Sequence, residues 1–304
     1  MKAVIYERYG PPDVLRLQEI DQPVPLRDEL LIKVRATSVT AGDWRMRKAH
    51  PFAARIYNGI FRPRKVKILG FDLAGEVVEI GPEVTKFQVG ESIFGSCGFG
   101  FGAYAEYRCL AEDEVLAKIP AGTSFQEAAA VPYGAIAPLL DLRDQVKIEP
   151  GLKVLIIGAS GSVGTFAVQL AEHFGARVSA VCSAKNSQLV EDLGAERVFD
   201  YRTENYWDAG MQFDLIYDAA GKSSRGQVKS ALTEDGKFVS VMKGSRSKPA
   251  RQQAIQDLAQ LFTDQKIHSV IDRTFPLEEI TAAHQYVENG KRFGNVIITV
   301  NHDR

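Results

Sequence analysis

The chain has 304 residues, 45% of them hydrophobic and 25% charged, which is typical of a globular protein and long enough for two lobes. Its formal net charge of -1 provides no global field that would attract nucleic acid or an acidic membrane, and no stretch reaches the apolar length of a membrane span. The three cysteines are an odd number without close spacing and the first residues resemble no signal peptide, so we expect a cytoplasmic protein without nucleic-acid partners or a membrane span.

The first part of the chain is predicted to be mainly β structure. We expect strands over residues 2–7, 14–20 and 29–36, and the last of these alternates apolar and charged side chains. Residues 37–43 (TSVTAGD) are small and polar, which indicates a loop that could face a ligand.

Residues 44–67 form the one locally basic and aromatic segment. They include eight Lys and Arg residues, four aromatic residues and no acid. The favoured interpretation is a solvated helix with aromatic residues buried beneath it. The alternatives are a lid over a substrate pocket or a contact with an anionic surface, and attachment to nucleic acid or a membrane would make binding strongly salt dependent.

Further strands are expected at residues 76–80, 89–95 and 104–110, after which the character of the chain changes near residues 119–122. An Ala-rich helix is predicted over residues 126–142, where Pro132 and Pro138 should kink it. Tyr133 lies next to such a kink, so its side chain could point into a cleft.

The most specific local signal lies at residues 153–183. An apolar run predicts a buried strand, the small residues 158–164 (GASGSVG) follow it, and then apolar residues recur at helical spacing until Gly175. A strand, a glycine turn and a helix in this order present backbone N–H groups to an anion, so the turn predicts a pyrophosphate site for a dinucleotide. The candidate residues are Ala159, Ser160, Gly161, Ser162, Val163 and Gly164.

The end of the next strand, at residues 177–182, indicates which dinucleotide is bound. An NAD site is expected to place Asp or Glu there for the ribose 2′-OH, whereas this chain has Ser183 and Lys185. Ser183 can donate to a 2′-phosphate and Lys185 can neutralise it, which favours NADPH over NADH. The other interpretation of Lys185 is a solvated residue at the start of a helix.

Alternating strands and helices over residues 151–264 predict a doubly wound parallel sheet. The tail returns to β character and is expected to rejoin the N-terminal lobe, so the predicted domains are residues 1–122 with 265–304, and residues 123–264. The elements expected after the glycine turn are strands at residues 197–201, 213–218, 236–242, 270–275 and 295–300, and helices at 186–193, 250–263 and 277–288.

Over its full length the chain resembles the medium-chain dehydrogenase/reductase superfamily, and within it the zinc-free quinone oxidoreductases related to zeta-crystallin. The resemblance implies an α/β fold in which the C-terminal tail completes a GroES-like β lobe beside a Rossmann domain, and a homodimer joined through an edge strand such as residues 237–242. It is carried by residues 34–43 (VRATSVTAGD), 70–77 (GFDLAGEV), 102–107 (GAYAEY), 158–164 (GASGSVG) and 290–295 (GKRFGN).

Zinc-dependent members of that superfamily bind catalytic zinc through a Cys and a His-Glu pair, at positions held here by Thr40, Phe71 and Asp72. Neither a thiolate nor an imidazole is available there, and a structural zinc would need four close cysteines. We therefore predict no metal, and expect the five scattered histidines to be surface or packing residues.

The same resemblance implies roles for residues outside the glycine turn. Thr40 is expected to hydrogen-bond cofactor or substrate and Asp43 to order its loop, while Tyr201 matches a tyrosine that contacts the adenosine phosphate. The pocket residues after Asp43 depart from the family pattern. The remaining implied cofactor-binding residues are Ala219, Ala220, Gly221, Val239, Val241, Gly294 and Asn295.

We expect an NADPH-dependent, zinc-free reductase that delivers hydride to a quinone or to the β-carbon of an α,β-unsaturated carbonyl. The product needs a proton, for which Tyr57 and Tyr133 are candidate donors; solvent is the alternative donor, and each Tyr could equally be a packed aromatic residue. Two rival functions stay open: a zinc-independent alcohol or aldehyde reductase, and an NADPH-binding sensor with little turnover.

Overall fold

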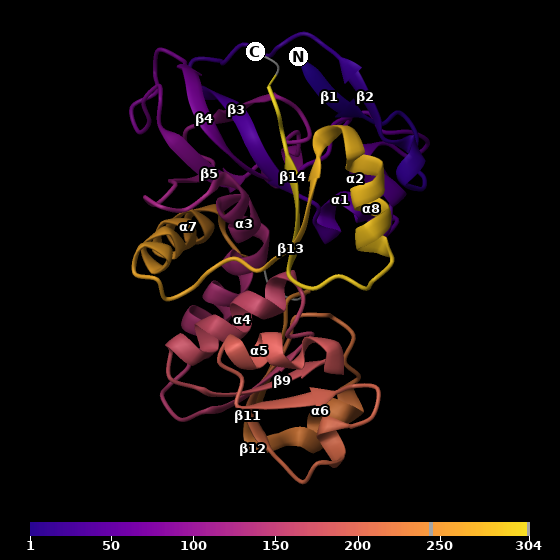
Figure 1. Cartoon of the computed structure of the whole chain (residues 1–304), viewed down its shortest axis with the longest axis vertical. Coiled ribbons are helices and arrows are strands. Elements are labelled where there is room, and N and C mark those ends of the chain that lie inside the picture. The colour runs from indigo at the N-terminus through magenta and orange to yellow at the C-terminus, as the bar shows by residue number, and fades with distance from the viewer. Residues whose placement is uncertain (243–245, 303–304) are drawn as a thin grey trace. The chain divides into compact units, whose positions relative to one another are not determined.

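The protein is described here from a computed structural model that covers residues 1–242 and 246–302, and it divides into two compact units (Figure 1). Unit 1 comprises Met1–Tyr133 and Ile271–Arg304, and unit 2 comprises Gly134–Val270. The unit boundaries lie at Tyr133 and Val270, whereas the sequence suggested residues 122 and 264 as the ends of functional domains. Among the described residues, no helix is long and apolar enough to cross a membrane.

Unit 1 is built on a mostly antiparallel sheet in the order β13-β14-β3-β4-β5-β7, with β6 also paired to β3. The tail strand β14 lies inside this sheet, because it pairs antiparallel with β3 and parallel with β13. The prediction that the tail completes the N-terminal β lobe is therefore confirmed. The strands are β1 (Lys2–Ile5), β2 (Arg16–Glu19), β3 (Glu29–Ser38), β4 (Asp72–Ile80), β5 (Ser92–Ser96), β6 (Tyr107–Ala111), β7 (Val115–Lys118), β13 (Ile271–Pro276) and β14 (Asn295–Thr299).

The core of unit 1 combines side chains from distant parts of the sequence. Ile32 and Val34 of β3 and Ile298 of β14 are fully buried, and Ala283 of the C-terminal helix packs in the same cluster. Burial of these apolar surfaces holds the tail to the N-terminal strands. The helices and 3-10 turns of this unit are η1 (Pro12–Val14), α1 (Ala41–Lys48), α2 (Ala53–Asn58), η2 (Gly98–Gly100), η6 (Leu277–Glu279) and α8 (Ile280–Glu288), and α3 (Phe125–Leu139) begins in it.

Residues 37–43 were expected to form a loop, and this was wrong in part. Residues 37 and 38 end β3, and Ala41 already begins α1. The helix starts here because Thr40 and Asp43 form a reciprocal capping box, which satisfies backbone N–H groups that a helix start otherwise leaves without partners. The basic segment 44–67, for which a solvated helix was the favoured interpretation, contains the end of α1 and all of α2.

Unit 2 contains a five-stranded parallel sheet in the order β10-β9-β8-β11-β12 (Figure 1). The chain runs outward from β8 to β10 and then returns to the other side of β8, which confirms the doubly wound prediction and places a topological switch point between β8 and β11. Its elements are η3 (Leu140–Val146), β8 (Lys153–Ile157), α4 (Ser162–His173), β9 (Arg177–Cys182), η4 (Ala184–Asn186), α5 (Ser187–Asp192), β10 (Arg197–Asp200), η5 (Tyr206–Asp208), β11 (Phe213–Asp218), α6 (Arg225–Ala231), β12 (Leu232–Ser240) and α7 (Lys248–Thr263).

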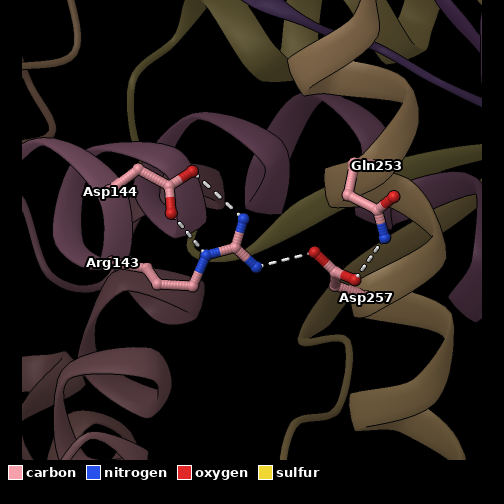
Figure 2. A network of polar contacts seen from close by, with 4 residues as sticks. All are labelled: Arg143, Asp144, Gln253 and Asp257. Atoms are coloured by element: carbon pink, nitrogen blue, oxygen red, sulfur yellow. Dashed lines mark hydrogen bonds and ion pairs between the residues drawn. The ribbon is translucent and has the colours of Figure 1, made fainter.

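A polar network fastens α7 to the π-helical turn η3 within unit 2. Figure 2 shows Arg143 donating to both oxygens of Asp144 and, at 2.6 Å, to Asp257, whose other oxygen accepts from Gln253 at 2.9 Å. The guanidinium is about one-third exposed, so this contact positions the helix rather than supplying much of its stability.

Candidate active site

The glycine turn between β8 and α4 has the geometry that an approaching pyrophosphate requires. Gly158 adopts a φ of 77°, and a Cβ on Gly164 would lie 2.1 Å from the Gly158 carbonyl oxygen, so only glycine allows α4 to approach the strand this closely. Gly161 is the N-cap and supplies no side-chain cap. The residues present therefore fit a dinucleotide, whose phosphates the N-terminal amides of α4 would bind.

Backbone hydrogen bonds tie this turn to the ends of the neighbouring strands. The Val181 carbonyl oxygen of β9 accepts from the amides of Gly158 and Ala159 at 3.0 and 3.1 Å, and Ala219 donates to Ile157 at 3.0 Å. The turn, the end of β9 and the start of the Ala219–Gly221 loop consequently meet at one edge of the sheet, where parallel sheets bind their ligands.

Asp218 shapes the loop after β11, and the sequence analysis missed it. Its buried carboxylate accepts from the backbone amides of Ala220, Gly221 and Ser223 at 3.0, 2.8 and 2.9 Å. An Asp that precedes a short, glycine-containing stretch at a strand end is the signal that could have revealed it. The carboxylate fixes the backbone of two predicted cofactor-binding residues.

The two other predicted positions on this side of the sheet belong to β12. Val239 is a buried residue of the strand, and Val241 follows its end, where its amide donates to the backbone carbonyl oxygen of Asp218 at 3.1 Å. Both therefore extend the edge that begins with the glycine turn.

The predicted 2′-phosphate residues follow the ends of β9 and β10, which are neighbours in register, since Cys182 pairs with Asp200. Ser183 is buried directly after β9, and Lys185 is exposed within the turn η4. Tyr201 is exposed after β10, and the guanidinium of Arg202 lies 5.7 Å from its ring centroid. Arg202 adds a second cation at this edge, which the sequence analysis did not single out.

Asn186 is a further residue that sequence reasoning missed. Its side-chain amide donates to the Ser160 hydroxyl at 3.0 Å, which links the glycine turn to the segment that carries Ser183 and Lys185. The predicted pyrophosphate and 2′-phosphate residues of unit 2 are thus joined by a hydrogen bond.

In unit 1, Thr40 and Asp43 hold each other at the start of α1. The Thr40 hydroxyl and amide donate to one Asp43 oxygen at 2.6 and 2.8 Å, and Gly70 donates to the other oxygen at 2.8 Å. Burial raises the pKa of Asp43 to about 6, although these hydrogen bonds favour the ionised form. Because the Thr40 hydroxyl donates its hydrogen bond to Asp43, it can meet an incoming ligand as a hydrogen-bond acceptor.

A buried polar chain runs from Asp43 to α8, and it was not foreseen. His284 lies between Arg47, whose Nε donates to Nδ1 at 3.4 Å, and the Tyr104 hydroxyl, which is 3.2 Å from Nε2. Burial and the Arg47 charge lower the pKa of His284 to about 3, so the imidazole is neutral and carries its proton on Nε2. His284 is therefore a structural residue of the core, in line with the expectation that the histidines are surface or packing residues.

Tyr133 lies beside Thr40 within unit 1. A Cβ on Gly42 would be 3.2 Å from the Thr40 hydroxyl oxygen and 3.9 Å from the Tyr133 ring, and Tyr133 packs edge-on against Phe71. Burial raises the pKa of the phenol, and the carboxylates of Asp43 and Asp72 act in the same direction, whereas the positive charges of Arg45 and Arg292 act in the opposite one. The phenol therefore keeps its proton at neutral pH.

Tyr57 is placed differently. Its hydroxyl donates to the Phe99 carbonyl oxygen at 3.0 Å, and its ring lies against Phe99 and 4.1 Å from the Lys65 ammonium. These contacts lie away from Thr40 and Tyr133 in the sequence, and the hydroxyl proton of Tyr57 is already donated, so the packed-aromatic interpretation fits Tyr57 better.

The remaining predicted residues, Gly294 and Asn295, lie at the start of β14 in unit 1. Asn295 is buried, and the Gly294 carbonyl oxygen accepts from Arg292 at 2.7 Å. This hydrogen bond connects them to the guanidinium near Tyr133.

Residues that would hold a catalytic zinc do not fit that ion. Asp72 is buried and accepts from the Ser38 hydroxyl and the Tyr133 amide, and Phe71 belongs to an aromatic cluster. Within residues 1–242 and 246–302, no three His, Cys, Asp or Glu side chains are grouped as metal ligands. The three cysteines are free and buried.

Comparison with known proteins identifies the class. Residues 27–121 match the alcohol dehydrogenase GroES-like domain, and residues 193–298 match the zinc-binding dehydrogenase family. The chain is 30% identical to 2-methylene-furan-3-one reductase of Solanum lycopersicum, over 98% of this chain and 79% of that protein. It is 29% identical to the chloroplastic NADPH-dependent alkenal/one oxidoreductase of Arabidopsis thaliana, over the same shares.

Among solved structures, the quinone oxidoreductase from Coxiella burnetii superposes with a TM-score of 0.89 at 30% identity, and the match covers 99% of both chains. The protein belongs to the medium-chain dehydrogenase/reductase superfamily, in its quinone oxidoreductase-like group. It is an NAD(P)H-dependent oxidoreductase of the quinone oxidoreductase and alkenal/one reductase kind.

Proposed function

We propose that the protein is a zinc-independent reductase that uses NADPH to transfer hydride to a quinone or to the β-carbon of an α,β-unsaturated carbonyl. The observation that carries the proposal is the combination of an open dinucleotide turn with a donor set, Thr40, Phe71 and Asp72, that cannot hold the usual zinc. Alcohol oxidation uses a metal ion to polarise the alcohol. Quinones and activated double bonds accept hydride without such a metal. The names of the relatives in this group support the same substrate classes.

The nicotinamide supplies the hydride, and the protein binds, orients and protonates. The N-terminal amides of α4 hold the pyrophosphate, while Ser183, Lys185 and Tyr201 hold the 2′-phosphate. The absence of an acid directly after β9 supports NADPH, because a carboxylate there would repel that phosphate.

In unit 1, Thr40 is held by Asp43 and offers its free lone pair to cofactor or substrate. Tyr133 donates the one proton that the enolate or the hydroquinone monoanion needs after hydride transfer, and Arg45 and Arg292 stabilise the resulting phenolate.

The test is NADPH consumption against a panel of a benzoquinone, an aromatic ortho-quinone, an alkyl vinyl ketone and a 2-alkenal, with NADH in parallel and an alcohol with NADP in reverse. Turnover of a quinone or an enone, faster with NADPH than with NADH, is the expected result. Turnover of the alcohol alone would favour the alcohol or aldehyde reductase. Tight NADPH binding without any turnover would favour the sensor.

Two further parts of the proposal concern assembly and location. β12 is an edge strand of the parallel sheet, and we propose that it joins two copies in a homodimer, which light scattering of the purified chain would detect. A cytoplasmic location is supported by three buried cysteines that form no disulfide.

A further inference from the structure

The segment around α2 exposes the residues that a globular protein normally buries. Five large apolar side chains that lie on or beside this segment are exposed, four of them within residues 52–61. Exposed hydrophobic residues that occur singly need no explanation, whereas a contiguous group marks an interaction site. The exposed fractions are 64% for Phe52, 71% for Ile56, 54% for Ile60, 90% for Phe61 and 69% for Phe99.

These five residues of unit 1 are here called the α2 patch; hydrogen bonds and a ring contact link α2 to Ile60 and Phe99, and Phe61 directly follows Ile60. Phe52 and Ile56 are four residues apart and share one side of α2. Arg55 donates to the Ile60 carbonyl oxygen at 3.0 Å, and Tyr57 holds Phe99 through its hydroxyl and ring.

The α2 patch is held in place by a buried polar residue. Asn58 is fully buried, and its side chain donates to the Tyr6 hydroxyl and the Val66 carbonyl oxygen while it accepts from the amides of Lys65 and Val66. Four hydrogen bonds thus satisfy an amide inside the protein, while phenylalanines remain outside. The exposure of the apolar side chains is a built feature of this segment.

Unpaired positive charge surrounds the patch. Arg62, Arg64, Lys65 and Lys67 are exposed, and none of them forms an ion pair with any residue in the described part of the chain. No acid occurs between Asp43 and Asp72, and both of these are fully buried. Residues 52–67 therefore combine exposed apolar side chains with four exposed cations and contain no acid.

We infer that the α2 patch docks the protein onto an anionic lipid bilayer. Aromatic and aliphatic side chains partition into the headgroup boundary, and nearby Lys and Arg are attracted to anionic lipids. A second copy meeting the same patch around a two-fold axis would bring the unpaired cations of both copies together, which is repulsive. Nucleic acid would use the cations but not Phe61 and Ile56.

The experiment is co-sedimentation of the full chain with vesicles of phosphatidylcholine alone or of phosphatidylcholine mixed with phosphatidylglycerol, at low and high salt. We expect partitioning onto the anionic vesicles to exceed that onto neutral vesicles by about tenfold and to fall with salt. The variant F52S/F61S should lose about tenfold of that binding, because two apolar side chains are removed from the boundary.

The matched control is V24S/L26S, which removes two apolar side chains that are 75% and 67% exposed elsewhere in unit 1 and should leave binding unchanged. Thermal melts would show that both variants fold. Equal binding to both vesicle types, no binding, or equal losses in the two variants would overturn the inference. So would association of copies that F52S/F61S abolishes, or retention of duplex DNA without vesicle binding. The readout requires neither cofactor nor substrate and does not depend on the proposed function.

Discussion

His284 shows how one buried imidazole can set the pH response of unit 1. It is fully buried, accepts from Arg47 and donates to Tyr104, and its pKa falls to about 3 from an ordinary value of 6.5. Unfolded chains take up this proton below about pH 6.5, but folded chains do not until about pH 3. The stability that the neutral imidazole provides is therefore present above pH 6.5 and is lost as the pH falls.

The variant H284Q retains an amide that can accept and donate in the same places but does not titrate. Between pH 7 and pH 5, the unfolding free energy of the wild type should fall by about 2 kcal/mol more than that of H284Q. The difference arises because, over the about 1.5 pH units below its ordinary pKa, His284 takes up a proton in the unfolded chain but not in the folded chain. Asp43 acts in the opposite direction, because its raised pKa of about 6 favours the folded state as the pH falls from about 6 to 4, but it is present in both proteins. Urea unfolding at both pH values measures the difference, and parallel pH curves would contradict the assignment.

Lys185 should discriminate the two cofactors. In K185A, we expect the KM for NADPH to rise by about tenfold, because one charge-assisted contact to the 2′-phosphate is lost, while the KM for NADH stays unchanged. Initial-rate kinetics with both cofactors test this. K229A, which removes an exposed lysine on α6, serves as the control. Equal effects on NADPH and NADH would show that Lys185 does not contact the 2′-phosphate.

Substitution of the two candidate tyrosines should distinguish the proton donor, Tyr133, from the packed aromatic residue, Tyr57. Y133F should lower kcat by about a hundredfold with little change in KM, as expected when a general acid is removed. Y57F loses a hydroxyl that already donates to Phe99 and should change kcat less than about twofold. If Y133F retained full kcat, solvent would be the donor.

At the scale of elements, the glycines of the β8–α4 turn have distinct tasks. A Cβ on Gly164 would overlap the Gly158 carbonyl oxygen, whereas one on Gly161 would lie 3.4 Å from it. We expect G164A to lose about 3 kcal/mol of stability. G161A should remain folded but bind NADPH about tenfold more weakly, because its methyl group faces the approaching phosphate.

G226A on α6 is the matched control, since a Cβ there meets nothing within 4 Å. It should gain about 0.5–1 kcal/mol from higher helix propensity. Thermal denaturation and NADPH fluorescence titration of the three variants measure both quantities. A destabilised G161A with normal affinity would assign that glycine to packing instead.

Local sequence signals predicted some of these elements and missed others. β8, the glycine turn and α4 were predictable because strand, turn and helix signals are local and adjoin one another. The same holds for Ser183 and Lys185, which follow directly from the end of β9. The start of α1 was missed although Thr40 and Asp43 have the spacing of a capping box, because the small polar residues 37–43 were interpreted as a loop.

The buried polar chain of unit 1 could not have been derived from the sequence. It consists of Asp43, Tyr104, His284 and Arg47. Tyr104 and His284 are 180 residues apart, and no spacing rule connects them. Such contacts depend on how β14 and α8 return to the N-terminal strands, which only the folded unit shows. The exposure of Phe52 and Phe61 was hidden for the same reason, since aromatic residues in a basic segment were expected to be buried beneath it.

At the scale of the whole molecule, the two units differ in how their sequences are distributed. Unit 2 is one continuous stretch with its own parallel sheet, whereas unit 1 needs β13 and β14 from the end of the chain. Residues 125–270, which include all of α3, should therefore fold when expressed alone. Residues 1–133 should not, because the end of β3 would lose its pairing with β14 and the core would lack α8. Circular dichroism and cooperative melting distinguish the two outcomes, and a cooperatively folding 1–133 fragment would refute the prediction.

The position of β14 also orders events on the ribosome. All of unit 2 is translated before β14, which pairs with the end of β3, so unit 2 can finish folding while the sheet of unit 1 is still incomplete. During that interval, the end of β3 that later pairs with β14 presents an unpaired edge to the surrounding solution. Nascent chains of this protein should consequently recruit chaperones early, at the N-terminal strands, and release them only when the last strand emerges.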